Sequence, residues 1–180
     1  MRNEYTKANR GTGGGLSAML LVFFLLISGI HALAQDAAAR LQLQLTDAKE
    51  VKVIEAGQET LRLVPVDSTS SGDILVYTIN YANNSDIPTA PETAVVGIIP
   101  KGTQFVAGSE TSGAGLELLY SINNGESFLP QPVTVPVRQA DGTFRQQPAP
   151  AEMYTHIRWV LKEPVPPQGS GKVLYKVKVK

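Results

Sequence analysis

The sequence predicts an all-β fold, an antiparallel β-sandwich with Greek-key connections. Apolar and polar residues alternate in several short runs, as in residues 73–82, where Leu75, Tyr77 and Ile79 fall on one face. Period-two alternation rich in Val, Ile, Tyr and Trp is typical of half-buried antiparallel strands. Turn-forming residues, such as the Asn-Asn-Gly run at 123–125, separate the strands at short intervals. This punctuation favours a sandwich over a parallel sheet.

The N-terminal strands follow from the simplest pattern. Three leucines alternate with Gln and Thr over residues 41–46, and pairs of Val at 51 and 53 and of Leu at 61 and 63 keep the same period. The short, Ala-rich stretch at 36–44 is the one place with helical spacing. In chain order, strands are expected near residues 41–46, 51–55, 61–65, 73–83, 93–99, 103–107, 116–122, 126–129, 133–138, 155–162 and 172–179.

The C-terminal strands predict the core. Trp159 shares a face with Ile157 and Leu161, so we expect it between the two sheets, with Tyr77 and Ile79 among its neighbours. In residues 172–180, lysines alternate with Val and Tyr. We expect these lysines to keep a terminal edge strand soluble and unpaired. Docking of an anionic polymer on the lysines is the alternative.

One long segment does not fit the core. Residues 138–152 (RQADGTFRQQPAPAE) are polar and rich in proline. We expect an exposed excursion there, in the form of a hairpin that turns at Asp141-Gly142.

The N-terminus predicts export. Residues 16–34 form an apolar stretch that follows Arg2, Lys7 and Arg10 and ends in Ala-Leu-Ala. This is the pattern of a signal peptide, with cleavage expected after Ala34. An uncleaved anchor is the alternative, but the apolar core at 16–30 is shorter than the roughly 20 residues that span a membrane. Residues 1–34 are therefore assigned to the signal peptide, and a periplasmic or extracellular location is expected.

Composition excludes several classes of function. The sequence has no cysteine, which excludes thiol catalysis and thiolate metal sites. The 16 basic and 16 acidic side chains balance, so binding of nucleic acid through excess positive charge is not expected. After cleavage, no membrane association is expected either.

Several segments carry a family resemblance. Residues 72–83 (GDILVYTINYAN) and 99–109 (IPKGTQFVAGS) are similar to two motifs of a bacterial conserved-repeat domain, a domain of unknown function that is numbered eleven in its series. Residues 154–159 (YTHIRW) and 167–173 (PQGSGKV) resemble its closing strands, although Gln168 stands where proline is more usual. The resemblance implies an immunoglobulin-like domain at 61–180, preceded by a strand segment at 35–60. It supplies no catalytic residues.

A second resemblance is local. Residues 121–128 (SINNGESF) resemble the Asp-box hairpin of sialidase-type propellers, with Asn, Ser and Phe in place of Asp, Thr and Trp. One copy cannot build a propeller. We interpret the motif as a turn capped by a polar side chain.

The candidate chemistry is sparse. Beyond the leader the sequence holds one histidine, His156. Because side chains alternate between the two faces of a strand, His156 lies on the face opposite Trp159, which is expected to be the solvent side. No catalytic, cofactor-binding or metal-binding residue is assigned, and no cofactor is expected. We therefore expect a noncatalytic exported module that binds a protein or envelope component through strand edges or through residues 138–152. The alternative is a small secreted hydrolase or carbohydrate-acting protein that uses loop carboxylates, with Asp141 as the candidate.

Overall fold

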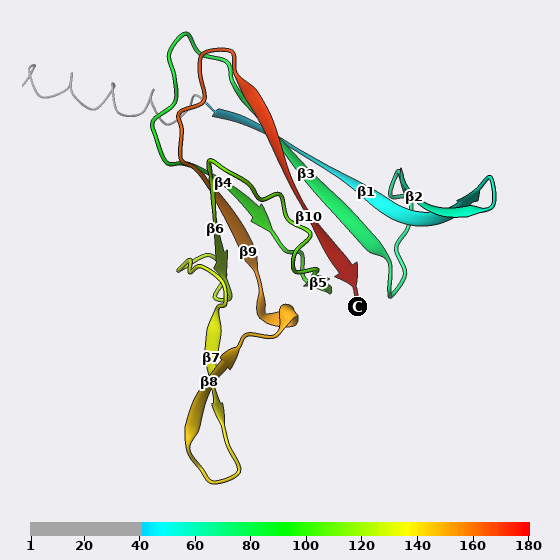
Figure 1. Cartoon of the computed structure of the whole chain (residues 1–180), viewed down its shortest axis with the longest axis vertical. Helices are drawn as coiled ribbons and strands as arrows, with labels where there is room; N and C mark the ends of the chain where they lie inside the picture. The colour runs from blue at the N-terminus through cyan, green and yellow to red at the C-terminus, as the bar shows by residue number, and fades with distance from the viewer. Residues whose placement is uncertain (1–40) are drawn as a thin grey trace, which may run out of the picture. The chain divides into compact units, whose positions relative to one another are not determined.

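The computed structural model describes residues 41–180, in which the regular secondary structure is almost entirely β-strand (Figure 1). The predicted leader and the first residues of the 35–60 segment lie outside the described residues. The elements in chain order are β1 (Leu41–Glu55), β2 (Gln58–Val64), β3 (Ile74–Asn83), β4 (Thr93–Ile98), β5 (Thr103–Phe105), β6 (Leu116–Ser121), β7 (Thr134–Arg138), β8 (Phe144–Pro148), the 3-10 helix η1 (Ala151–Met153), β9 (His156–Leu161) and β10 (Ser170–Val179).

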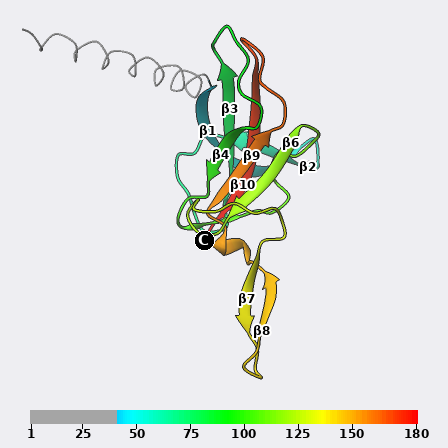
Figure 2. The same cartoon turned by 90° about the vertical axis from the view of Figure 1, so that its left-hand side faces the viewer.

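Two antiparallel sheets pack face to face, which confirms the predicted sandwich. The first sheet has the order β2-β1-β3-β10-β5 and the second the order β4-β9-β6. Aromatic contacts join them: the Trp159 ring of β9 lies 5.9 Å from that of Tyr175 of β10, and Phe105 of β5 lies 6.0 Å from Tyr120 of β6. The strands β7 and β8 form a separate hairpin that extends away from both sheets (Figures 1 and 2).

The core follows the alternation in the sequence. Ile157, Trp159 and Leu161 point inward from β9 and are buried, whereas the residues between them are only half-buried. Ile79 is also buried, as predicted, while Tyr77 is half-buried and stacks on Tyr175. The position predicted for Trp159 between the sheets is therefore confirmed.

The N-terminal part differs from expectation. Residues 41–55 form one strand of 15 residues instead of two short ones. The strand is continuous because it changes partners: residues 41–50 pair with β3, and residues 49–55 pair with β2. Helical spacing at 36–44 was misleading for residues 41–44, which lie in β1. Residues 36–40 lie outside the described part of the chain.

One further strand assignment was wrong, and the strand expected near 172–179 is present as β10 but not at an edge. Residues 126–129 form no strand and contribute only an isolated bridge between Leu129 and Tyr120. Strand β10 is not an edge strand, because it lies between β3 and β5. Its lysines therefore do not protect a sheet edge.

The hairpin predicted at 138–152 is present, but it lies earlier in the chain, from the start of β7 at Thr134 to the end of β8 at Pro148. It pairs β7 with β8, and Gly142 adopts the positive φ of +84° that a tight turn requires. The position between residues 60 and 61, proposed from the sequence as a domain start, lies inside β2.

Candidate functional site

His156 lies on the outward face of the second sheet, as its parity predicted. Its ring packs edge-on against Phe128, with 6.3 Å between ring centroids, and its Nδ1 lies 3.1 Å from Oγ1 of Thr155. Arg158, two residues along the same face, stacks on Phe128 with its guanidinium carbon 3.6 Å from the ring centroid. The histidine is thus held in a packed surface cluster, and neither Thr155 nor Phe128, which contact its ring, is an acid that could orient it.

Asp141, the candidate for hydrolysis, serves as a turn residue. Its carboxylate accepts hydrogen bonds from the backbone N–H of Thr143 at 3.0 Å and from the hydroxyl of Thr143 at 2.7 Å. These two bonds hold the pKa of Asp141 below its ordinary value, so the carboxylate stays ionised. An ionised carboxylate that caps its own loop is suited to closing the hairpin.

Two hollows on the surface of residues 41–180 bear on the hydrolase alternative, and neither is lined by paired carboxylates. The larger, of about 590 Å³, lies at one end of the first sheet over β1, β3 and β10, and both polar residues such as Asn80 and Lys172 and the apolar Leu43 line it. The smaller, of about 350 Å³, includes Glu163 as its one acidic residue. Within residues 41–180, no group of three or more His, Cys, Asp or Glu residues is arranged to hold a metal ion.

The motifs of the resemblance act locally in the structure. Gly72 has a φ of +95°, and Asp73 accepts a hydrogen bond from the backbone N–H of Ser70 at 2.7 Å. Asn83 is fully buried, and its side-chain amide donates to the carbonyl oxygens of Ile87, Val165 and Pro166. Each motif residue therefore fixes a turn or a strand end.

The turn that resembles an Asp-box forms as interpreted. The hydroxyl of Ser121 donates to Oδ1 of Asn123 and accepts from the backbone N–H of Gly125 at 2.9 Å. Oδ1 of Asn123 in turn accepts from the backbone N–H of Ser127 at 3.1 Å. The polar side chains close the loop, and Phe128 then packs against Arg158.

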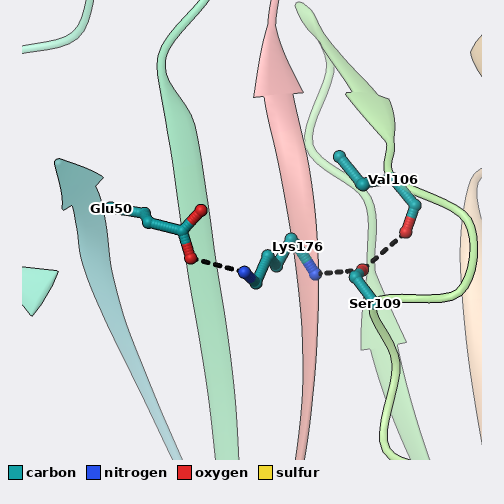
Figure 3. A network of polar contacts seen from close by, with 4 residues as sticks. All are labelled: Glu50, Val106, Ser109 and Lys176. Carbon is teal, nitrogen blue, oxygen red and sulfur yellow. Dashed lines mark hydrogen bonds and ion pairs between the residues drawn. The ribbon is translucent and has the colours of Figure 1, made fainter. Parts of the chain in front are cut away.

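An ion pair lies on the outward face of the first sheet. Lys176 of β10 reaches across β3 to the carboxylate of Glu50 on β1 (Figure 3). Its backbone N–H donates to the hydroxyl of Ser109 at 2.8 Å, and that hydroxyl donates to the carbonyl of Val106 at 2.5 Å. Residues 106–111 thereby cover the edge of β10 beyond β5.

An exposed apolar surface lies on the inward side of β1. Val173, Ile79 and Leu45 form one row across β10, β3 and β1, and their exposed fractions are 0%, 4% and 59%. Leu43, which lies in the next row on the same side, is 49% exposed. The second sheet therefore covers β10 and β3 but stops short of β1.

The strand β4 borders this surface with an unpaired edge. It pairs only with β9, and its residue Gly97 lies against Tyr175 of β10. At the opposite side of the second sheet, β6 lies over β5 through Tyr120 and Phe105. The free edge of β4 is therefore directed toward β3 and β1, as Figure 2 also indicates.

Comparison with family models, with curated proteins and with solved structures returned no match to this chain. Within residues 41–180, no helix has the length and apolar character needed to cross a membrane.

Sequence reasoning named strand edges and residues 138–152 as contact surfaces but did not identify Leu43 and Leu45. The alternation placed these leucines on one face of a strand, and such a face is normally buried. Their exposure arises because the second sheet has fewer strands than the first, and the alternation pattern does not encode the number of strands that cover a face.

Proposed function

We propose that the protein is an exported, noncatalytic module of the immunoglobulin-like type, related to the bacterial conserved-repeat domain, that binds a protein or another component of the bacterial envelope. In this proposal the leader is cleaved after Ala34 and the module acts in the periplasm or outside the cell. The observation that carries the proposal is the exposed leucine surface of β1, since soluble domains rarely leave a regular strand apolar and uncovered on its core side.

The hairpin of β7 and β8 provides a second contact surface. It extends from the sandwich, and Phe144 at the start of β8 is 68% exposed. Exposed aromatic side chains on a projecting hairpin are suited to anchoring a partner. Asp141 in the same hairpin closes its own turn, which favours binding over hydrolysis.

Site-specific photocrosslinking in the native host tests the function. A photoreactive amino acid replaces Leu45, Phe144 or, as an exposed control in a turn, Lys101. A binding module gives a discrete crosslinked species from Leu45 or from Phe144 and none from Lys101. The proposal is overturned if both positions stay uncrosslinked, or if the purified protein turns over a glycan or peptide and Asp141→Ala abolishes the turnover.

Intact-mass measurement of the exported protein tests the processing. The expected N-terminus is Gln35. Recovery of residues 1–34 on the protein in the membrane fraction would show that the leader is retained as an anchor.

A further inference from the structure

The free edge of β4 is prepared for another strand. The backbone N–H of Ile99 donates to the carbonyl of Thr155 at 2.9 Å, which continues the ladder between β4 and β9. Because hydrogen-bonded positions alternate along an antiparallel pair, residues 93, 95 and 97 face β9, while Ala94, Val96 and Ile98 direct their backbone groups to the free edge. The carbonyl of Ile98 already accepts a hydrogen bond from the hydroxyl of Tyr175, so Ala94 and Val96 are the positions offered to an added strand.

This edge lacks the usual protection. Free strand edges in soluble proteins commonly carry a charged side chain, a proline or a bulge that prevents pairing. Residues 93–98 (TAVVGI) include no charge and no proline, and all six pair with β9 in unbroken register. By contrast, the free edge of β2 carries Glu59 and Arg62, both paired with side chains of β1.

A strand added at this edge would lie over β1. Neighbouring strands are about 4.8 Å apart, so one additional strand extends the second sheet past β3. Its inward side chains would then meet the row of Leu45 and Ile79 and the next row of Leu43 and Tyr81. One strand is therefore enough to cover both exposed leucines.

Charge defines one further position of the ligand. Asp47 follows Leu43 and Leu45 on the same face of β1 and is exposed. The five ion pairs of the described residues do not include it, whereas its neighbours Lys49 and Glu50 are engaged by Asp73 and Lys176. The carboxylate of Asp47 is thus available to a basic side chain two positions beyond the apolar pair.

We propose that the protein binds an extended segment of another polypeptide, which adds as a strand to the free edge of β4, sets two alternate apolar side chains on Leu43 and Leu45, and presents a Lys or Arg to Asp47. Backbone hydrogen bonds to Val96 supply affinity. The side chains of Leu43, Leu45 and Asp47 on β1 supply selectivity, as side-chain contacts do in other cases of strand addition. This inference rests on the proposed binding function and names its site and ligand class.

Synthetic peptides provide the test. The probe is a fluorescent peptide of alternating Thr and Val with a Lys at the next inward position, and its control has Glu in place of Lys. With the purified exported protein, fluorescence anisotropy is expected to show the Lys peptide binding about three- to tenfold more tightly than the Glu peptide. Asp47→Lys is expected to reverse that order.

A matched pair of variants tests the edge. Val96→Pro removes an N–H that faces the free edge without removing a bond to β9, whereas Val96→Thr keeps the N–H and the branched shape. Loss of peptide binding in Val96→Pro alone, with circular dichroism unchanged in both variants, supports strand addition. If Val96→Pro unfolds, Ala94→Pro replaces it, because residue 94 has the same orientation.

Three results would overturn the inference. The first is that the Lys peptide does not bind at millimolar concentration. The second is that the Lys and Glu peptides bind equally well, both to the unmodified protein and to Asp47→Lys. The third is that the protein self-associates and Asp47→Lys abolishes the self-association, because a second copy would then be the occupant. Crosslinking from Phe144 without peptide binding at β4 would overturn this inference and leave the binding function standing.

Discussion

Tyr175 of β10 lies directly against the bare backbone of Gly97 of β4. A Cβ added at Gly97 would stand 2.7 Å from Cε1 of the tyrosine ring and 3.1 Å from Cζ3 of Trp159. The hydroxyl of Tyr175 also donates a hydrogen bond of 2.5 Å to the carbonyl of Ile98. Burial raises the pKa of Tyr175 above its ordinary value, so this donor keeps its proton. Packing and a hydrogen bond therefore hold the two sheets together at β4, the strand that borders the proposed ligand site.

Gly97→Ala is expected to destabilise the protein by about 1–3 kcal/mol. The added methyl group overpacks a site closed by two aromatic rings, and neither ring has room to yield without shifting its sheet. Urea denaturation followed by circular dichroism measures the change. Val96→Thr, at the neighbouring outward position, is the control and should change stability by less than about 0.5 kcal/mol. An unchanged midpoint for Gly97→Ala would show that the sheets are not tightly packed here.

Trp159→Ala is expected to cost about 3–5 kcal/mol, because it removes the largest fully buried side chain. Trp159→Phe should cost less but still destabilise, since the indole N–H donates a 2.9 Å hydrogen bond to the carbonyl of Thr111 that phenylalanine cannot replace. As the sequence contains a single tryptophan, its fluorescence reports directly on this site. An emission maximum typical of water-exposed indole in the folded protein would contradict the structure.

Local patterns in the sequence were sufficient to predict most of the strands and much of the core. The alternation around Trp159 and in residues 73–82 identified inward faces correctly, because burial and period-two spacing are physically coupled in a sheet. The turns at Gly125 and Gly142 followed from residues that tolerate positive φ.

Features that depend on distant partners were not predictable in this way. The lysines of β10 indicated an edge strand, but β5 and residues 106–111 arrive from far along the chain and pair with it. The exposure of Leu43 and Leu45 likewise depends on how many strands lie opposite β1. The hydrogen bonds that Asn83 makes to Val165 and Pro166 join segments more than 80 residues apart, so a local sequence pattern does not predict them.

Asn83→Asp is expected to destabilise the protein by about 3 kcal/mol or more at neutral pH. The buried amide donates to three carbonyl oxygens, and an aspartate of the same shape would direct negative charge at them. Those carbonyls would raise the pKa of the new carboxyl in the folded state, so the variant should become less stable as the pH rises. Asn84→Asp, an exposed neighbour, is the control. Equal stability of the two variants in urea would contradict the role of Asn83.

Asp73→Asn is expected to change how the folding stability depends on pH in the acidic range. Lys49, at 2.7 Å, and the backbone N–H of Ser70 lower the pKa of Asp73 below its ordinary value of 3.8. A carboxyl whose pKa is lowered by folding contributes stability above its ordinary pKa and loses that contribution as the pH falls through the lowered value. Denaturation midpoints should therefore fall less steeply with acid in Asp73→Asn than in the unmodified protein. Asp86→Asn, an exposed carboxylate in a loop, should leave the steepness unchanged.

Replacement of the whole β7–β8 hairpin is expected to preserve the sandwich. Val133 and Ala149 stand at its base, are both buried, and are joined by a 2.8 Å hydrogen bond from the N–H of Ala149 to the carbonyl of Val133. An Asn-Gly turn in place of residues 134–148 can close this pair, because two-residue turns connect hydrogen-bonded partners.

The expected cost of this replacement is about 1–2 kcal/mol, since Val135 is half-buried against the core. Removal of residues 139–148 alone is the contrasting change. It deletes β8 but leaves β7 without a partner, so that variant should aggregate during refolding. Thermal denaturation and light scattering distinguish the two variants. A loss of more than about 4 kcal/mol in the Asn-Gly variant would show that the hairpin supports the core and is not simply a projecting contact surface.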